Sequence, residues 1–187
     1  CLDTFLHAQR LIKSDAEISM MRHACAVSAQ AHILAMQCTT ASHEYHLQAT
    51  IEAHFAQHAM RPAYTSIVGG GRNACVLHYI ENNTPLQPGD LVLIDAGASH
   101  GLYNADITRT FPINGRFSHA QAAVYQVVLE AQLAAIAAVQ VGNTWQQMHD
   151  AAMRVLTQGL VQLGILTGNL DTLIQDGAYK PYYMHST

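Results

Sequence analysis

The sequence has 187 residues, which is room for one ordinary domain; half of its residues are apolar and 12% are charged. This composition is typical of a chain with a buried core and excludes extended disorder. The formal net charge is −4, Lys and Arg are scattered singly, and the apolar stretches are interrupted well short of a membrane span, so neither nucleic acid nor a membrane is an expected partner.

Two helices are predicted in the first third of the chain. Ser14 can accept a backbone N–H at a helix start and Glu17 can reach back, which is a capping box, and helical spacing continues to about residue 37. The second helix is predicted over residues 44–59, where an Arg-Pro pair ends it. Six histidines of these runs are expected to be solvated and are assigned no function: His23, His32, His43, His46, His54 and His58.

The middle of the chain changes to β structure, and helices then return. Short apolar runs alternate with glycines over residues 64–82, which predicts strands around a loop, and the pair Pro88-Gly89 precedes a further strand. Ser118 is a predicted cap for a helix to about residue 139, and Thr144 for a helix to about residue 163, with a short helical turn after Leu170. Helices on either side of antiparallel strands predict an α+β fold.

Two aspartates lie in a predicted hairpin, in the stretch LVLIDAGASHGLYNADITRTF. If His100 and Gly101 are its two loop residues, Asp95 pairs directly with Asp106 across the ladder, which brings their Cβ atoms to about 5 Å. Two carboxylates at about 4 Å repel by roughly 4 kcal/mol at an effective dielectric constant near 20. Protonation of one carboxylate or a divalent cation between the two would relieve this repulsion. Exposure of both aspartates on a simple hairpin is the alternative.

Several motifs resemble one family in order and in spacing. LHYIENN, PGDLVLIDAG, NADITRTFPINGRFS and YYMHST resemble the catalytic domain of aminopeptidase P, the Xaa-Pro aminopeptidases of the pita-bread metallopeptidases. The resemblance begins near Lys13 and continues to the last residue. It implies that residues 13–187 are a partial metallopeptidase catalytic domain and that residues 1–12 are a linker from a missing N-terminal domain.

The resemblance also implies a fold and a cofactor. The expected pita-bread fold has two pseudo-symmetric halves, each with helices outside a curved antiparallel sheet, and its second half is incomplete here. The expected cofactor is a pair of divalent metal ions, manganese in most of the family, held by five protein ligands. Carboxylate-rich ligand sets suit manganese on general grounds as well. The remaining three ligands are expected beyond Thr187, so this fragment by itself is expected to be inactive.

Five residues match functional positions of the family, and Thr108, two residues beyond Asp106 on the same strand face, is expected to support them. Asp95 matches the first aspartate ligand and Asp106 the aspartate that bridges the two ions. His78 and His185 match histidines that line the substrate site, where they hydrogen-bond the substrate or the tetrahedral intermediate. Tyr64 matches a tyrosine that supports the metal-binding carboxylates, with a plain core residue as the alternative. Thr108 is expected to support Asp106 by a hydrogen bond.

The resemblance implies an Xaa-Pro aminopeptidase, a metallo-exopeptidase that removes the first residue from peptides with proline at the second position. A prolidase that cleaves Xaa-Pro dipeptides, or a pita-bread binding module without catalysis, are the alternatives. An incomplete domain would expose an apolar face, so a homo-oligomer is expected. None of the four cysteines forms a C-x-x-C pair, which favours reduced thiols and a cytoplasmic protein.

Overall fold

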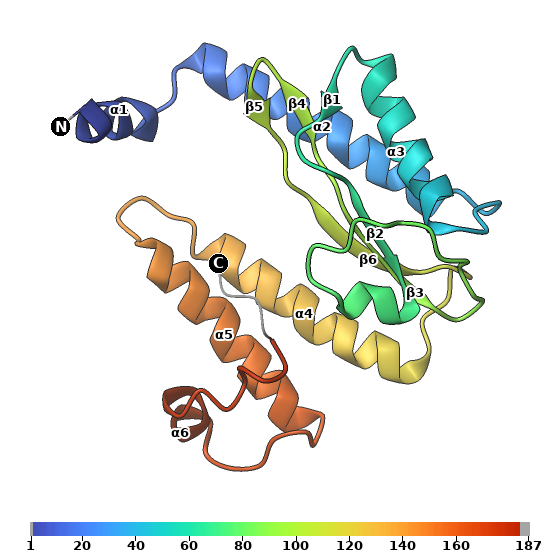
Figure 1. Cartoon of the computed structure of the whole chain (residues 1–187). Coiled ribbons are helices and arrows are strands. Elements are labelled where there is room, and N and C mark those ends of the chain that lie inside the picture. Colours follow the sequence, from blue (N-terminus) through green and yellow to red (C-terminus); the bar gives the residue numbers. More distant parts are fainter. Residues whose placement is uncertain (1, 184–187) are drawn as a thin grey trace. The chain divides into compact units, whose positions relative to one another are not determined.

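A computed structural model describes residues 2–183, and contacts between elements divide the chain into two compact units, Cys1–Arg116 and Phe117–Thr187. Unit 1 contains three helices: α1 (Leu2–Leu11), α2 (Asp15–Met36) and α3 (Glu44–Gln57). Its strands are β1 (Arg61–Pro62), β2 (Ile67–Gly70), β3 (Leu91–Asp95), β4 (Ala98–His100), β5 (Tyr103–Asn104) and β6 (Thr108–Pro112), with the 3₁₀ helix η1 (Gly71–Cys75) after β2. Unit 2 contains α4 (His119–Ala137), α5 (Trp145–Gln162) and α6 (Leu170–Gln175) (Figure 1).

The helix starts follow the capping chemistry of the sequence. Ser14, Ser118 and Thr144 each accept the backbone N–H of the third helical residue, and the side chain of that residue reaches back to the cap, so all three helices begin with a capping box. Most of the predicted linker, residues 1–12, is instead the ten-residue helix α1, which has no buried residue. The predicted helices are therefore confirmed to within two residues at their ends.

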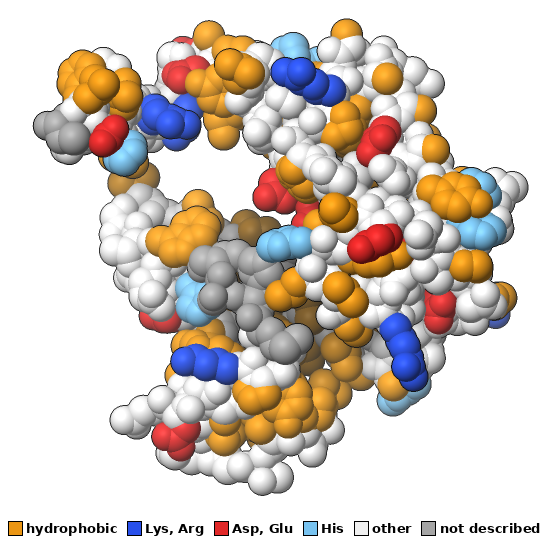
Figure 2. Space-filling model, in the orientation of Figure 1, with side chains coloured by type: hydrophobic (Ala, Val, Ile, Leu, Met, Phe, Trp, Pro, Cys, Tyr) orange, Lys and Arg blue, Asp and Glu red, His pale blue; other side chains and the backbone are white. Residues whose placement is uncertain are grey.

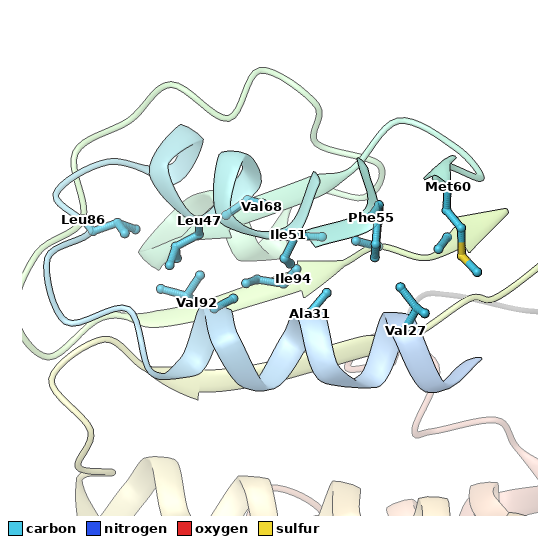
Figure 3. Close-up of a cluster of buried hydrophobic side chains, with 13 residues drawn as sticks. Val27, Ala31, Leu47, Ile51, Phe55, Met60, Val68, Leu86, Val92 and Ile94 are labelled. Atoms are coloured by element: carbon cyan, nitrogen blue, oxygen red, sulfur yellow. The ribbon is translucent and has the colours of Figure 1, made fainter. Parts of the chain in front are cut away.

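The core of unit 1 lies between two helices and one face of a sheet. Along β3, Val92 and Ile94 are buried while Leu91, Leu93 and Asp95 are half-buried, because successive side chains of a strand point to opposite faces. Figure 3 shows Val92 and Ile94 between α2 and α3, in the same cluster as Ala31 and Leu47. The full core cluster comprises Val27, Ala31, Ala35, Leu47, Ile51, Phe55, Met60, Val68, Leu86, Val92, Ile94, Ala96 and Ala98. The helices thus cover one face of the sheet, and Asp95 lies on the other face.

The strands form two three-stranded antiparallel sheets, ordered β2-β3-β6 and β1-β4-β5. One long hairpin passes through both sheets, because β3 pairs with β6 and β4 pairs with β5. The expected second strand within residues 64–82 is not formed: β2 is followed by η1 and a turn. The reason is that the side chains of this segment bond to α3 instead of a neighbouring strand, as described below.

Among the six histidines, His32 departs furthest from the sequence prediction. His32 is only 2% exposed, and its Nε2 atom lies 3.0 Å from the carbonyl oxygen of Ala96. Burial lowers the pKa of His32, which favours the neutral imidazole. The helical period alone does not distinguish a histidine on the buried face of α2 from one on the exposed face when the neighbours are Ala and Gln. His32 therefore anchors α2 to the end of β3.

Unit 2 is built on close packing of α4 against α5. A Cβ atom on Gly159 of α5 would lie 2.2 Å from Cγ1 of Val127 on α4, so this glycine allows the two helices to approach. An exposed ion pair at 2.8 Å joins Arg154 of α5 to Asp171 of α6, and such pairs contribute about 1 kcal/mol or less. Figure 2 shows Lys and Arg as separate blue groups on the face it presents, without a basic stripe.

By length and average composition alone, α4 could cross a membrane, although Gln126 and Glu130 interrupt its apolar residues, as expected from the sequence. These polar residues are too few among the Ala, Val and Leu residues of α4 to bring its mean hydropathy below that of a membrane-spanning helix. Core helices of soluble proteins have the same properties, and α4 by itself does not identify a membrane segment.

Glu17 links the start of α2 to β5, and this contact predicts an acid-sensitive part of the stability. The hydroxyl of Tyr103 donates to one carboxylate oxygen of Glu17, and Ser14 donates to the other from its backbone N–H at 2.6 Å. These hydrogen bonds, that of Tyr103 first, lower the pKa of Glu17 to about 2. A lowered folded-state pKa adds stability above the ordinary value of 4.5, and this stability is lost as the pH falls toward 2.

We therefore expect Glu17→Gln to destabilise the protein near pH 6 and to destabilise it much less near pH 2. Urea unfolding of both proteins across this range measures the difference between them. A difference that stays constant from pH 6 to pH 2 would contradict the assignment.

Candidate metal centre

The hairpin that carries the two aspartates has a different register from the predicted one. Asp95 pairs with Thr108, not with Asp106. The loop residues are Gly101 and Leu102, with φ of +57° and +68°, rather than His100 and Gly101. Two consecutive positive φ values are typical of a type I′ turn, and glycine takes the first of these positions. The predicted direct pairing is therefore wrong, because the turn is one residue further along the chain.

Asp95 and Asp106 still share one face of the sheet. A shift of two residues in register preserves the face of every side chain, whereas a shift of one would have placed Asp106 on the face of the helices. Asp106 is thus a diagonal neighbour of Asp95, at a typical separation of roughly 7–8 Å between such positions. The sequence prediction that the two carboxylates converge holds for this reason.

Gly97 shapes the chain between the two aspartates. A Cβ atom at Gly97 would lie 1.8 Å from the carbonyl oxygen of Ala105 and 3.1 Å from the backbone nitrogen of Asp106. Its own carbonyl accepts the N–H of Ala63 at 2.8 Å. Gly97 therefore lets the segment that carries Asp106 pass directly over the end of β3. Gly97 belongs to the sequence motif DAG, but the need for glycine there is apparent only from the close approach of the Ala105 backbone, which we call the crossing.

Tyr64 joins the two carboxylates. It lies between β1 and β2, and its hydroxyl oxygen is 2.5 Å from Oδ1 of Asp95 and 3.0 Å from Oδ1 of Asp106. Burial raises the pKa of Tyr64 well above its ordinary value, and the hydrogen bonds and negative charges of the two aspartates raise it further. Tyr64 thus remains a protonated donor at neutral pH, and both carboxylates face the same point.

The chemistry of this site fits a divalent cation in part. Asp95 is half-buried and Asp106 is exposed, so their free oxygens can reach an ion from solvent. Oxygen ligands of this kind suit hard divalent ions such as Mn²⁺ and Mg²⁺. Within residues 2–183, however, no group of three or more His, Cys, Asp or Glu side chains is arranged to hold a metal ion. The two aspartates are therefore a partial ligand set.

The other three predicted residues are not joined to this pair by any hydrogen bond that the described residues show, or lie outside those residues. Thr108 is the cross-strand neighbour of Asp95, and no hydrogen bond joins it to Asp106 in the part of the chain that the structure describes. His78 is exposed in the turn after η1, where its φ of +55° is unusual for a residue with a side chain. His185 lies outside the described residues. The structure thus brings together Tyr64, Asp95 and Asp106.

The model of metallopeptidase family M24 matches residues 19–187. This chain belongs to metallopeptidase family M24. The match includes β3, β6 and both aspartates, and it extends through α4, α5 and α6 of unit 2.

Relatives within the M24 family are similar along nearly the whole chain. The Xaa-Pro aminopeptidase of Haemophilus influenzae is 51% identical over 182 residues, which are 96% of this chain and 42% of that protein. The structure of aminopeptidase PepP of Pseudomonas aeruginosa is 51% identical with a TM-score of 0.94, covering 97% of this chain and 41% of that one. The structure of Zn-substituted aminopeptidase P of Escherichia coli in complex with product is 42% identical with a TM-score of 0.88. That match covers 92% of this chain and 40% of the E. coli chain.

These comparisons confirm the family and the pita-bread fold that the motifs imply. The structural match to the P. aeruginosa protein includes the strands and helices of both units. This chain spans about 42% of the length of the H. influenzae relative.

Proposed function

We propose that this sequence forms part of a metal-dependent aminopeptidase that removes the first residue from peptides with proline at the second position. The observation that carries the proposal is the convergence of two carboxylates on the Tyr64 hydroxyl, in a chain of family M24. The Xaa-Pro aminopeptidase relative at 51% identity supports the same substrate class.

In this proposal Asp95 and Asp106 hold divalent ions, with further ligands from residues outside the described part. Zinc in the E. coli aminopeptidase supports divalent ions as a class, and manganese is our specific proposal. The chemistry that bound divalent ions supply is polarisation of the scissile carbonyl and a lowered pKa for water. Tyr64 fixes the direction of both carboxylates, since its single hydroxyl lies within hydrogen-bonding distance of each.

His78 is proposed to bind the substrate and not the metal. A hydrogen bond from its imidazole to the oxygen of the scissile amide would strengthen as negative charge develops there. His78 is exposed, as a group that meets substrate must be, and it is held in a left-handed conformation that costs free energy. Backbone strain of this kind is common at functional sites. His185 is proposed to act in the same way.

Product analysis tests the substrate class. The protein should contain this sequence within a chain of its relatives' length and be supplied with Mn²⁺. We expect release of the first residue from an Xaa-Pro-Xaa tripeptide, slower cleavage when alanine replaces the proline, and little cleavage of the Xaa-Pro dipeptide. Preferred cleavage of the dipeptide would establish a prolidase. Absence of cleavage in a metal-loaded protein would leave the binding module as the explanation.

The assignment of His78 predicts a separation between catalysis and metal binding. In the same full-length protein, His78→Ala should lower kcat by about 10²–10³-fold, the usual cost of a lost oxyanion donor. Metal content should stay at the wild-type stoichiometry, because Asp95 and Asp106 lie on other segments. Steady-state kinetics together with elemental analysis measure both quantities. Loss of metal from His78→Ala would show that the division of roles is wrong.

The three cysteines that the structure describes, Cys25, Cys38 and Cys75, are free thiols, and Cys25 and Cys75 are exposed. Exposed thiols persist in a reducing compartment. They support our proposal that the protein acts in the cytoplasm.

A further inference from the structure

Glu44, the first residue of α3, is a fully buried carboxylate that the metal site does not use. Charged side chains are rarely buried unless they are paired or hydrogen-bonded. Hydrogen-bond donors surround Glu44 on both oxygens. Oε1 accepts from Gly70 N at 2.8 Å and Asn73 Nδ2 at 2.9 Å, and Oε2 accepts from Tyr79 OH at 2.8 Å and Thr84 N at 2.9 Å.

All four donors come from one stretch of chain, residues 70–84, which we call the 70–84 segment. It contains η1 and the turn with His78. Gly70 is at its beginning and Thr84 at its end, so the carboxylate bonds the backbone at both ends. The backbone N–H of Glu44 also donates to the carbonyl of Thr84 at 3.1 Å. One side chain of α3 thereby closes the whole segment into a loop.

Tyr79, the residue directly after His78, takes part in the same hydrogen bonds. Tyr79 is buried and its hydroxyl donates to Glu44, while Asn73 donates to that same hydroxyl at 3.0 Å. His78 itself is exposed at φ +55°. A non-glycine residue keeps this conformation only when its surroundings hold the backbone in place. The contacts of Tyr79 supply that restraint on one side of His78, and those of Asn73 on the other.

The hydrogen bonds around Glu44 favour an ionised carboxylate, because the nitrogen atoms of Gly70, Asn73 and Thr84 can only donate. Burial raises the pKa of Glu44, but the hydrogen bonds from Gly70, Asn73, Thr84 and Tyr79 outweigh it and lower the pKa. Glutamine has the same shape, but in either orientation its amide N–H groups would face a backbone N–H that cannot accept, that of Gly70 or that of Thr84. Glu44→Gln therefore disturbs the 70–84 segment without creating a cavity.

We propose that Glu44 is a positioning residue, which holds the 70–84 segment so that His78 meets the substrate. The inference rests on the proposed function of His78. The metal ligands belong to β3 and to the chain before β6, which Glu44 does not contact through hydrogen bonds. Glu44 should thus affect catalysis through His78 alone, while metal binding stays unchanged.

A double-mutant cycle on the full-length, Mn²⁺-loaded protein tests this inference, with kcat measured on an Xaa-Pro-Xaa tripeptide for wild type, Glu44→Gln, His78→Ala and the double mutant. Displacement of a group by about 1 Å can lower a rate up to about a hundredfold, so Glu44→Gln should lower kcat by about ten- to a hundredfold. In the His78→Ala background the same change should lower kcat by less than about twofold, because residues that act as a unit are not additive. Metal content should match wild type in all four proteins.

Two further variants complete the design. Glu130→Gln is the matched control, because Glu130 is an exposed glutamate of α4 that accepts a hydrogen bond from Gln126, outside the 70–84 segment. It should leave kcat within about twofold in both backgrounds. Tyr79→Phe removes a single donor to Glu44, and it replaces Glu44→Gln in the cycle should that variant fail to fold.

Three outcomes are informative. Glu44→Gln could lower kcat by the same factor in the wild-type and His78→Ala proteins, or it could cause loss of metal. Either result would overturn the positioning role while the aminopeptidase function stands. A wild-type protein that does not cleave Xaa-Pro peptides would overturn the proposed function and this inference with it. A cycle in which the effect of Glu44→Gln disappears without His78 supports the inference.

Discussion

Replacement of Asp106 by asparagine is expected to abolish peptide cleavage by the full-length, metal-supplied protein while leaving its fold intact. An asparagine amide is neutral and has one acceptor oxygen in place of two, so it is a poor ligand for a divalent cation. Loss of a group that merely supports a metal ligand costs about 10–100-fold in activity or metal affinity, so loss of a ligand should cost more than about a thousandfold.

The fold should tolerate this change for reasons visible in the site. Asp106 is exposed, and Tyr64 can still donate to Asp95 at 2.5 Å. Removal of one negative charge also relieves repulsion between the two carboxylates. We therefore expect the thermal midpoint of Asp106→Asn to equal or slightly exceed that of the wild type.

Elemental analysis, kinetics and thermal unfolding measure these effects. Asp150→Asn is the control, since Asp150 lies on α5 and accepts a hydrogen bond from Gln146 at 2.7 Å, away from both aspartates in sequence. It should change neither metal content nor rate. An Asp106→Asn protein that keeps wild-type activity would remove Asp106 from the metal site.

Replacement of Gly97 by alanine is expected to destabilise the protein by about 3 kcal/mol or more, at the upper end of the usual cost of overpacking. The new Cβ would lie 1.8 Å from the carbonyl oxygen and 2.4 Å from the carbonyl carbon of Ala105. Both are backbone atoms, so no side-chain rotation can relieve the overlap. The hairpin must instead separate at the crossing, and Asp106 moves with it.

Gly115→Ala separates this steric overlap from the ordinary cost of replacing a glycine. Nothing lies within 4 Å of a Cβ atom at Gly115, but its φ of +72° disfavours alanine by about 1–2 kcal/mol. Urea unfolding should therefore rank Gly97→Ala as more destabilising than Gly115→Ala. The reverse order would show that the chain relaxes at the crossing without loss of pairing.

Local chemistry in the sequence was sufficient to predict the helices and the family. Ser14, Ser118 and Thr144 define helix starts through contacts within four residues, and such contacts need no tertiary structure. The motifs around Asp95 and Asp106 identified the M24 family and the pita-bread fold. The common face of the two aspartates was also predicted, since the parity of a strand survives a two-residue error in register.

Tertiary structure alone decided the register, the crossing and the buried polar groups. The turn at Gly101 and Leu102 could not be distinguished from one at His100 and Gly101, because glycine suits either position. Glu44 had the appearance of an ordinary acidic residue in a first helical turn, yet its four donors come from 26 to 40 residues further along the chain. Contacts over such distances depend on how α3 packs beside β2, and neither composition nor periodicity encodes that packing in a form that can be read locally.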